Sequence, residues 1–320
     1  MSVEPIPLGE PIIRDVRFRI EMTVSCHDCA SIPKVMNAGQ IVTEDGERVQ
    51  IMHNGLRVLA GGYYGDWMVE IITRLCGHHE PQEELVFYEV LKHLPAQATM
   101  IELGGFWSYY SLWFLHQNAA TRKAIVVEPD PHHLAIGCAN ARLNDRKIAF
   151  IQASVGSESI SERDFLAETS GLIRIPQITV AQLLNDYKIA RLDLLHCDAQ
   201  GAETNVLRSC MGLLAERRIR FCFVSTHTHH ISGDPLTHQR CLALLKEAGG
   251  QILAEHDVQE SFSGDGLIVA YFGESPLSWP SLHPSYNRYS TSLFRNPLFD
   301  LDDANRKYLT AINGPPPIIA

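Results

Sequence analysis

Two acidic residues end successive apolar stretches, and a glycine turn follows the first of them. Glu102 lies in the apolar run 99–103, directly before Gly104 and Gly105, and Glu128 ends a second apolar run about two dozen residues later, the spacing of one βαβ unit. Glycine lets a backbone approach a ligand closely. An acid at the end of the second strand can accept two hydrogen bonds from a ribose diol. The pair predicts a nucleoside-bearing cofactor.

The same turn argues against a dinucleotide. A pyrophosphate site wants three glycines, and the third position reads Ser108 here. Glu102 would repel a diphosphate, whereas it would attract the sulfonium and ammonium groups of S-adenosylmethionine (SAM). A NAD-linked oxidoreductase is therefore disfavoured. An ordinary βαβ unit with a glycine-bearing turn is the alternative that involves no cofactor.

A second group of polar residues follows two later apolar runs. Asp198 ends the run 192–197, and His227, His229 and His230 follow the run 219–225. Methyl transfer requires that a proton be removed from the acceptor hydroxyl, and a histidine with a pKa near neutrality suits this step. We expect His227 to be the base and Asp198 either to share that role or to orient the methionine end of SAM. The alternatives without a catalytic role are that Asp198 caps the following helix and that the histidines lie in a solvated loop.

The same residues form only a loose set of metal ligands. Asp198, His227 and Glu203 show no ligand spacing on one element. No divalent metal is therefore expected to be required.

The N-terminal third holds the candidates for substrate contact. His79 and Glu80 stand just before the βα alternation begins, and Tyr64 and Trp67 lie in a loop rich in glycine and aromatic residues. With His229, these residues offer the mixture of rings and polar groups that sugar-like acceptors favour. Core packing of the aromatic residues is the common alternative.

The eight cysteines do not indicate a disulfide framework in a chain of 320 residues. Cys26 and Cys29 have the C-x-x-C spacing of zinc ligands, but a structural site needs two more ligands. Cys76, His78 and His79 are the nearby candidates. Reduced, locally packed thiols are the default expectation, and a zinc site is the alternative.

Composition excludes several classes of function. The formal net charge of −10 and the absence of a basic cluster argue against nucleic-acid binding. No apolar run approaches the roughly 20 residues of a membrane span. The N-terminus lacks the basic start and apolar core of a secretory signal, so a cytoplasmic location is expected.

Strand-like and helix-like stretches alternate from residue 98 onward, which is typical of a doubly wound, parallel α/β sheet with helices on both faces. Gly264 and Gly266 suit a hairpin that makes the edge at the last strand antiparallel. The predicted strands are 99–103, 124–128, 148–152, 192–197, 219–225, 251–254 and 267–271. The predicted helices are 109–115, 131–144, 180–186, 202–214 and 237–248.

Three regions are expected along the chain. Residues 1–95 form an N-terminal accessory region on the substrate side, in which 18–24 alternates like a strand. Residues 96–273 form the SAM-binding domain, and 274–320 form a tail rich in proline and aromatic residues. A plain surface tail would carry fewer aromatics. We therefore expect the tail to pack on the domain or on a partner chain, which leaves a homodimer open. Its aromatic residues are Trp279, Tyr286, Tyr289, Phe294 and Phe299.

Four ordered segments resemble the FkbM family of SAM-dependent methyltransferases. Segment 101–111 (IELGGFWSYYS) is similar to IDIGANIGYYS, and VEPDP at 127–131 to FEPNP. ITVAQLL at 178–184 is similar to ITLDDLL, and LDLLHCDAQGAE at 192–203 to IDLIKIDVEGAE. The resemblance covers roughly residues 100–272. It departs at His196, which replaces a lysine, at Phe106, which replaces a small polar residue, and at Ser225, which stands where a glutamate is usual.

The resemblance implies a Rossmann-like class I methyltransferase fold, a seven-stranded sheet, SAM as cofactor and O-methylation of a hydroxyl on a glycan or a secondary metabolite. An N-methyltransferase and a non-catalytic SAM-binding partner in a biosynthetic complex are the alternatives. The residues expected to bind the cofactor are Glu102, Gly104, Tyr109, Ser111, Glu128, Pro129, Ala153, Ser154, Asp198 and Gln200.

Overall fold

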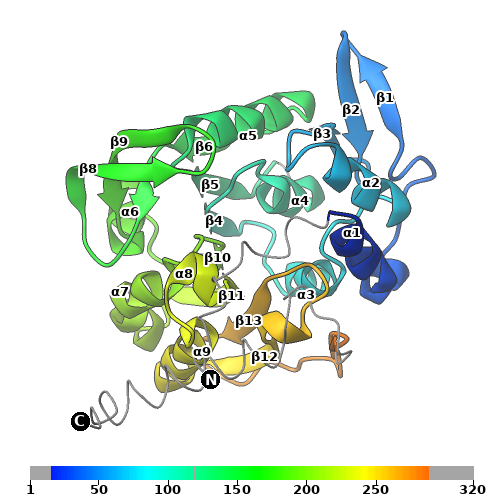
Figure 1. Cartoon of the computed structure of the whole chain (residues 1–320). Helices are drawn as coiled ribbons and strands as arrows, with labels where there is room; N and C mark the ends of the chain where they lie inside the picture. Colours follow the sequence, from blue (N-terminus) through cyan, green and yellow to red (C-terminus); the bar gives the residue numbers. More distant parts are fainter. Residues whose placement is uncertain (1–15, 119, 288–320) are drawn as a thin grey trace, which may run out of the picture.

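A seven-stranded sheet forms the centre of the molecule (Figure 1), seen in a computed structural model that describes residues 16–118 and 120–287. The order is β12-β13-β11-β10-β4-β5-β6, and all pairs are parallel except those of β13, which is antiparallel to both neighbours. The strands are β4 (Thr99–Leu103), β5 (Lys123–Val127), β6 (Ile148–Ile151), β10 (Leu192–Cys197), β11 (Ile219–Thr226), β12 (Gln251–His256) and β13 (Gly266–Tyr271). The predicted mostly parallel α/β sheet is confirmed. The last strand lies inside the sheet rather than at its edge, because β13 inserts between β12 and β11.

Alternate residues of the central strands enter two different apolar cores, as the period of two in a strand requires. Leu194 and Phe221 join the core on one face, and Leu195 and Cys222 join the other. The first face is covered by α3 (Pro81–Lys92), α4 (Tyr109–Gln117) and α5 (Pro131–Leu143), and the second by α6 (Val180–Asp186), α7 (Glu203–Ala215) and α9 (Thr237–Glu247). None of the helices within the described ranges is long and apolar enough to cross a membrane.

The N-terminal region packs on the α3–α4 face of the sheet. It contains α1 (Val16–Ser25), the short helix η2 (Asp28–Ser31), α2 (Asp66–Arg74) and a small antiparallel sheet of β1 (Ile41–Glu44), β2 (Glu47–Ile51) and β3 (Arg57–Leu59). Ile20 and Met52 of this region share one apolar core with Met100 of the main sheet. Domain boundaries at residues 95 and 273 stay a prediction.

The expected strand at 18–24 is wrong, because this segment is part of helix α1. Arg17 and Glu21 form an ion pair one helical turn apart, and Arg74 of α2 also binds Glu21. The pair of Arg17 and Glu21 has the spacing of four residues that brings two side chains together on one face of a helix. The apolar and polar residues of this segment alternate as they do in a strand, so the sequence pattern predicted a strand in place of the helix.

A β-hairpin that the sequence reading missed lies between β6 and α6 (Figure 1). It consists of β8 (Ile160–Ala167) and β9 (Gly171–Ile178), and the two-residue strand β7 (Ser154–Val155) pairs with β9. Strand β8 is mostly exposed and carries four charged or polar residues in succession, so it has little of the apolar signature of a strand, whereas β9 is largely apolar and ends in buried residues. Its turn is tied to the sheet because Asp130, the N-cap of α5, accepts hydrogen bonds from the backbone N–H groups of Thr169 and Ser170.

The described part of the C-terminal segment packs on the rest of the chain. Ser285 donates its backbone N–H to Asp28, Tyr286 donates its hydroxyl to the carbonyl of Glu255, and Trp279 lies against His93 with ring centres 5.4 Å apart. Packing on the domain is thus seen up to residue 287. Tyr289, Phe294 and Phe299 lie outside the described residues.

Gly104 marks the closest approach between β4 and the segment after β10. Its φ is +78°, and a Cβ atom there would lie 1.6 Å from the backbone carbonyl oxygen of Asp198. Backbone atoms cannot swing aside as a flexible side chain can. The first turn of the βαβ unit therefore requires glycine both for its conformation and for space.

We predict that Gly104→Ala destabilises the protein by more than about 1 kcal/mol, because both the positive φ and the clash oppose it. Urea unfolding followed by circular dichroism measures the change. The control is Gly212→Ala, at an exposed helical position with open space around it, where alanine should stabilise by about 0.5–1 kcal/mol. Equal stabilities for the Gly104→Ala variant and the unsubstituted chain would contradict this account.

Candidate active site

A cavity of about 700 Å³ opens at the carboxyl ends of β4, β5 and β10. Ligands of open α/β sheets bind at this end, outside the strands. The floor carries Glu102, Glu128 and Asp198, one from each of these strand ends. The N-terminal region and the β8–β9 hairpin add walls, through Tyr63, Tyr64, His79, Glu80, Arg163 and Phe165.

The turn after β4 holds a left-handed backbone at positions where glycine is usual. Phe106 has φ +37° and Ser108, the N-cap of α4, has φ +61°. Ser108 occupies the third glycine position of the nucleotide-binding pattern, so its conformation is retained although the residue differs. The Phe106 ring stacks on His133 with centroids 3.5 Å apart. This stacking gives the larger side chain a fixed place at the cavity.

Glu128 is held by the backbone around it. Its Oε2 accepts the N–H of Phe106 at 2.9 Å, and its Oε1 accepts the N–H of Asp130 at 2.9 Å. A carboxylate offers about four lone-pair sites, so these bonds orient the group and leave acceptor capacity for a ligand. The side chain is 4% exposed and lines the cavity.

Glu102 is buried at the base of the same turn. Its Oε2 accepts the N–H of Ser111 at 3.1 Å. Burial raises the pKa of Glu102 to about 8, against the lowering effect of the Ser111 hydrogen bonds and with help from the charges of Asp198 and Glu128. A bound cation would favour the ionised form of this carboxyl.

Asp198 and His227 meet beside the cavity, with a second acid behind them. His227 Nε2 lies 3.1 Å from Asp198 Oδ1, and His227 Nδ1 lies 2.8 Å from Glu203 Oε1. Asp265 Oδ1 is 3.7 Å from the same Nε2. His227 is fully buried, whereas a quarter of the Asp198 side chain is exposed. Asp198 therefore faces the cavity and His227 stands behind it.

The charges around His227 set its protonation. Burial alone would lower the pKa of His227, but the charges of Asp265 and Glu203 and its hydrogen bonds to Asp198 and Glu203 hold the pKa well above its usual value. Burial raises the pKa of Asp198, partly offset by the hydrogen bond to His227. An imidazolium with acids at both nitrogens has no lone pair with which to take a proton. This geometry does not favour the sequence-based expectation that His227 is the base.

Ser225 replaces the glutamate usual in the resembling family, and another element brings a carboxylate to this place. The Ser225 hydroxyl donates to Glu83 of α3, with both carboxylate oxygens at 3.2 Å. Burial raises the pKa of Glu83 well above its ordinary value, and the charges of Glu80 and Asp198 add to this effect. A carboxyl group supplied by α3 thus lies next to Ser225, the residue that stands in place of the usual glutamate.

A second histidine joins the cavity wall to the N-terminal region. His79 Nε2 lies 3.1 Å from Glu80 Oε2, and the Tyr110 hydroxyl donates to the same oxygen at 2.9 Å. Burial would lower the pKa of His79, but Glu80 and Glu84 raise it to about 10. The ring of Tyr63 stacks on Trp107 at 4.5 Å and 3° beside this pair. The wall thus combines flat rings with a buried ion pair.

His196, which replaces the lysine of the resembling family, makes the floor less charged. Both of its ring nitrogens are buried without a hydrogen-bond partner among the described residues. Burial lowers its pKa to about 3. The ring stacks on Phe223 with centroids 5.1 Å apart. A neutral ring thus lines the cavity where the pattern predicts a cation.

The structure separates the expected site residues into those that line the cavity and those that support it. The expected residues that line it are Glu102, Gly104, Glu128, Pro129, Ser154, Asp198, Gln200, Tyr64, His79 and Glu80. The expected residues that are not among the lining residues are Tyr109, Ser111, Ala153, His227, Trp67 and His229. Tyr109 and Ser111 are fully buried in α4, and the N–H of Ser111 fixes Glu102.

The sequence reading missed the lining residues of the β8–β9 hairpin, including Arg163, Phe165 and Glu168. The available signal was the Thr169-Ser170-Gly171 turn between two stretches of β-branched and aromatic residues. Cys26 and Cys29 are both buried free thiols, and burial raises the pKa of Cys26 to about 12. The zinc alternative at these two cysteines stays a hypothesis.

The buried Glu102 predicts a pH dependence of stability. Its pKa is about 8 in the folded protein and near 4.5 when unfolded, so its contribution to stability is full below about pH 4.5 and is lost as the pH rises through 8. Glu102→Gln should therefore gain stability relative to the unsubstituted chain on going from pH 5 to pH 8.5. The gain should be at least about 1.4 kcal/mol, the value of one pKa unit.

Urea unfolding at the two pH values tests this prediction, with the exposed Glu216→Gln at the end of α7 as control. If the difference between Glu102→Gln and the unsubstituted chain stays constant with pH, Glu102 does not carry this titration.

Comparison with known proteins agrees with this geometry. The family model described as "Methyltransferase FkbM domain" matches residues 90–252, just over half of the chain. No curated protein sequence matches.

Solved structures with a similar fold are distant. The precorrin-6y C5,15-methyltransferase of Geobacter metallireducens is 13% identical with a TM-score of 0.39, over 59% of this chain and 88% of that chain. The TrmK of M. capricolum in complex with S-adenosylhomocysteine is 12% identical with a TM-score of 0.38, over 73% of this chain and 88% of that one. The N-terminal domain of human METTL16 in complex with SAH is also 12% identical, with a TM-score of 0.38, over 61% and 71%.

These distant likenesses indicate no substrate. The family match spans β4, β5, β6, β10 and β11, and thereby the three strand ends that carry Glu102, Glu128 and Asp198. With the seven-stranded sheet and the cavity at its carboxyl edge, the match assigns the chain: the protein belongs to the FkbM family and is a SAM-dependent methyltransferase.

Proposed function

We propose that this methyltransferase transfers a methyl group to a hydroxyl of a glycan or a secondary metabolite. The observation that carries the proposal is the half-open position of Asp198, which faces the cavity while His227 and Glu203 hold it from behind. A hydroxyl must lose its proton on methylation, and a positioned carboxylate with a raised pKa can accept that proton.

The cavity residues fit SAM in charge and in hydrogen-bonding capacity. Glu128 keeps free acceptor sites for two ribose hydroxyls. Burial raises the pKa of Glu102, and a nearby positive charge of SAM would stabilise its ionised form. When bound, SAM supplies an electrophilic methyl group on a sulfonium. Gly104 keeps side-chain bulk away from the place where the backbones of the two strand ends meet.

The acceptor side is built from the N-terminal region. Tyr63 and Tyr64 of this region and Trp107 of the turn after β4 offer flat rings, and Glu80 offers an acceptor for hydroxyl groups. Sugars present apolar ring faces next to hydroxyls, and aromatic side chains with a polar group nearby match that mixture. The roles of Tyr64, His79 and Glu80 as substrate contacts belong to this proposal.

The division of labour between Asp198 and His227 follows from their exposure. Asp198 lies at the cavity and is proposed as the base. His227 Nδ1 is hydrogen-bonded to Glu203, and its Nε2 forms an ion pair with Asp198 at 3.1 Å. His227 is therefore proposed as a positioning residue that fixes the Asp198 carboxylate. This reverses the assignment that the sequence alone favours, because burial between acids was not visible in it.

Identification of the acceptor class tests the proposal. We expect label from methyl-labelled SAM to appear on hydroxyls in a library of sugars and hydroxylated natural products, and to be lost with the matching deoxy compounds. Label found only on amines would make the protein an N-methyltransferase. SAM binding without transfer to any member of a wide library would favour the non-catalytic binding partner.

Glu128→Ala should weaken SAM binding by about 1–3 kcal/mol, the scale of lost hydrogen bonds to a charged group. Isothermal titration calorimetry measures the dissociation constant, and thermal melts show whether the loss of two backbone contacts harms folding. The control is Glu158→Ala, an exposed carboxylate at the cavity rim, which should bind SAM almost normally. An unchanged dissociation constant for Glu128→Ala would remove Glu128 from the cofactor site.

Asp198→Asn should lower kcat by about 10²–10⁴-fold while SAM still binds, because the amide cannot accept the proton. His227→Gln should lower kcat less, by up to about 10²-fold, as expected for a displaced neighbour. The acid limb of the kcat profile should lie above the ordinary pKa of an aspartate and should persist in His227→Gln. The reverse ranking, with the acid limb lost in His227→Gln, would make His227 the base.

A further inference from the structure

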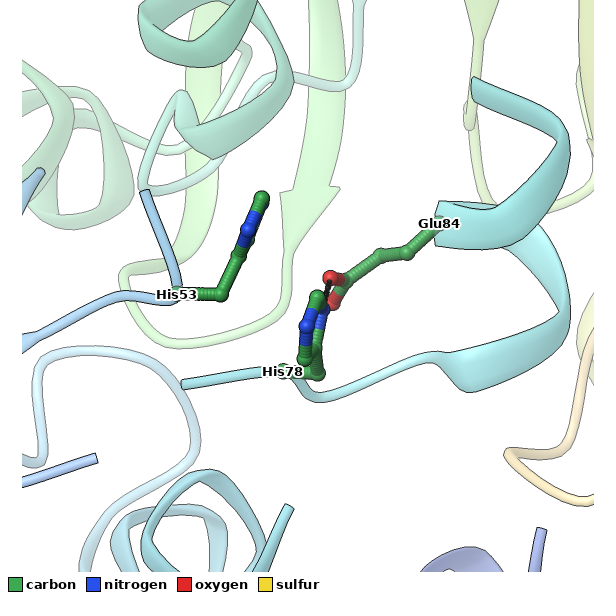
Figure 2. A group of neighbouring side chains, drawn as sticks. All are labelled: His53, His78 and Glu84. Carbon is green, nitrogen blue, oxygen red and sulfur yellow. Dashed lines mark hydrogen bonds and ion pairs between the residues drawn. The ribbon is translucent and has the colours of Figure 1, made fainter. Parts of the chain in front are cut away.

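Three buried polar side chains from separate segments converge away from the cavity (Figure 2). His53 lies in the loop between β2 and β3, His78 lies between α2 and α3, and Glu84 is in the first turns of α3. Their exposed fractions are 2%, 0% and 0%. Each offers one ligand atom, and these three atoms all lie within 4.8 Å of one another. None of the three residues lines the cavity.

The two histidines each have a buried ring nitrogen that is not hydrogen-bonded to any described residue. Nε2 of His53 and Nε2 of His78 are both buried without a hydrogen-bond partner among the described residues. The imidazole rings stack at 4.2 Å and 14°, and Trp113 closes over the edge of His53. A buried nitrogen without a partner is costly, and two of them in one cluster call for a ligand.

The surroundings hold the three side chains in place as the supporting residues of a metal centre do. His53 Nδ1 contacts the carbonyl of Pro33 at 3.0 Å, which makes Nδ1 the protonated nitrogen and leaves Nε2 with a lone pair. Glu84 Oε1 accepts the backbone N–H of His79 at 2.8 Å and lies 2.7 Å from His79 Nδ1. Its Oε2 contacts His78 Nδ1. Both ligand types are thus oriented before any ion binds.

The loops themselves are in close contact at this point. The backbone N–H of His53 donates to the carbonyl of Gly77 at 3.0 Å, and a Cβ atom on Gly77 would lie 2.2 Å from that nitrogen. Gly77 has φ +89°. Only glycine therefore lets the segment before His78 run so close to the loop of His53, and this approach brings the two imidazoles together.

We propose that His53, His78 and Glu84 bind one divalent transition-metal ion of the zinc type as its three protein ligands, with a water molecule completing the coordination. Two imidazoles and one carboxylate are nitrogen and oxygen ligands that suit Zn²⁺. None of the three side chains lines the cavity, so the ion would act by joining segments rather than by contacting substrate. It would tie the β2–β3 loop and the α2–α3 loop to α3, whose N-cap residue Glu80 lines the active site.

Metal analysis of the full-length chain, purified without a histidine tag, tests the proposal. After dialysis against Zn²⁺ and then buffer, we expect about one zinc per chain in the unsubstituted protein and a loss of most of it in His53→Gln and in Glu84→Gln. His256→Gln is the matched control: His256 is also fully buried with an unpartnered Nε2, but it lies in β12. It should keep the metal.

Two further measurements keep the test decisive if a variant folds poorly. The unsubstituted chain stripped with a chelator should melt at a lower temperature and recover on addition of Zn²⁺. Its Co²⁺ form should show ligand-field bands without a thiolate charge-transfer band. Loss of metal in Cys29→Ser but not in His53→Gln would assign the ion to the thiols and overturn the proposal. A folded chain that retains no zinc, cobalt or nickel would show that the cluster is a metal-free buried hydrogen-bonded set.

Discussion

The concentration of buried carboxylates at one end of the sheet is the constraint on which this structure depends. Glu102, Glu128 and Asp198 end three adjacent parallel strands, and all three line one cavity. Like charges in a poorly hydrated place repel, so each must be neutralised, hydrogen-bonded or paired. The chain uses a different device for each: protonation near neutrality for Glu102, backbone N–H groups for Glu128, and the imidazole of His227 for Asp198.

The central sheet could be predicted from the sequence because its signals are local. Strand ends such as Leu103 and Cys197 are fixed by an apolar run that stops at a polar or glycine residue, and the helix at Val180 begins at a threonine cap. The acids at the strand ends follow from the same pattern. The motif resemblance implies a seven-stranded, mostly parallel sheet, and the structure confirms it.

The walls of the cavity could not be predicted in the same way, since they depend on contacts between distant residues. Strand β8 is largely exposed and charged, so it lacks the apolar periodicity of a strand. The turn of the β8–β9 hairpin is held by Asp130 across about forty positions of sequence. The contact between Glu83 of α3 and Ser225 likewise joins residues that are far apart in the sequence, so no local pattern predicts it. The strand expected at 18–24 is wrong as well: the segment is part of helix α1, whose Ile20 enters the core and whose Glu21 pairs with Arg74 of α2.

The burial of His227 between two carboxylates bears on which residue of the site can accept a proton. A histidine at a strand end appears in the sequence as a base with a pKa near neutrality. In the structure it has Glu203 at one nitrogen and Asp198 at the other, so its charge is fixed by its neighbours. In the function proposed above, the proton acceptor is the group that is exposed to the cavity, which is Asp198 rather than His227. The proposed role of His227 is then to position the Asp198 carboxylate beside it, rather than to take the proton itself.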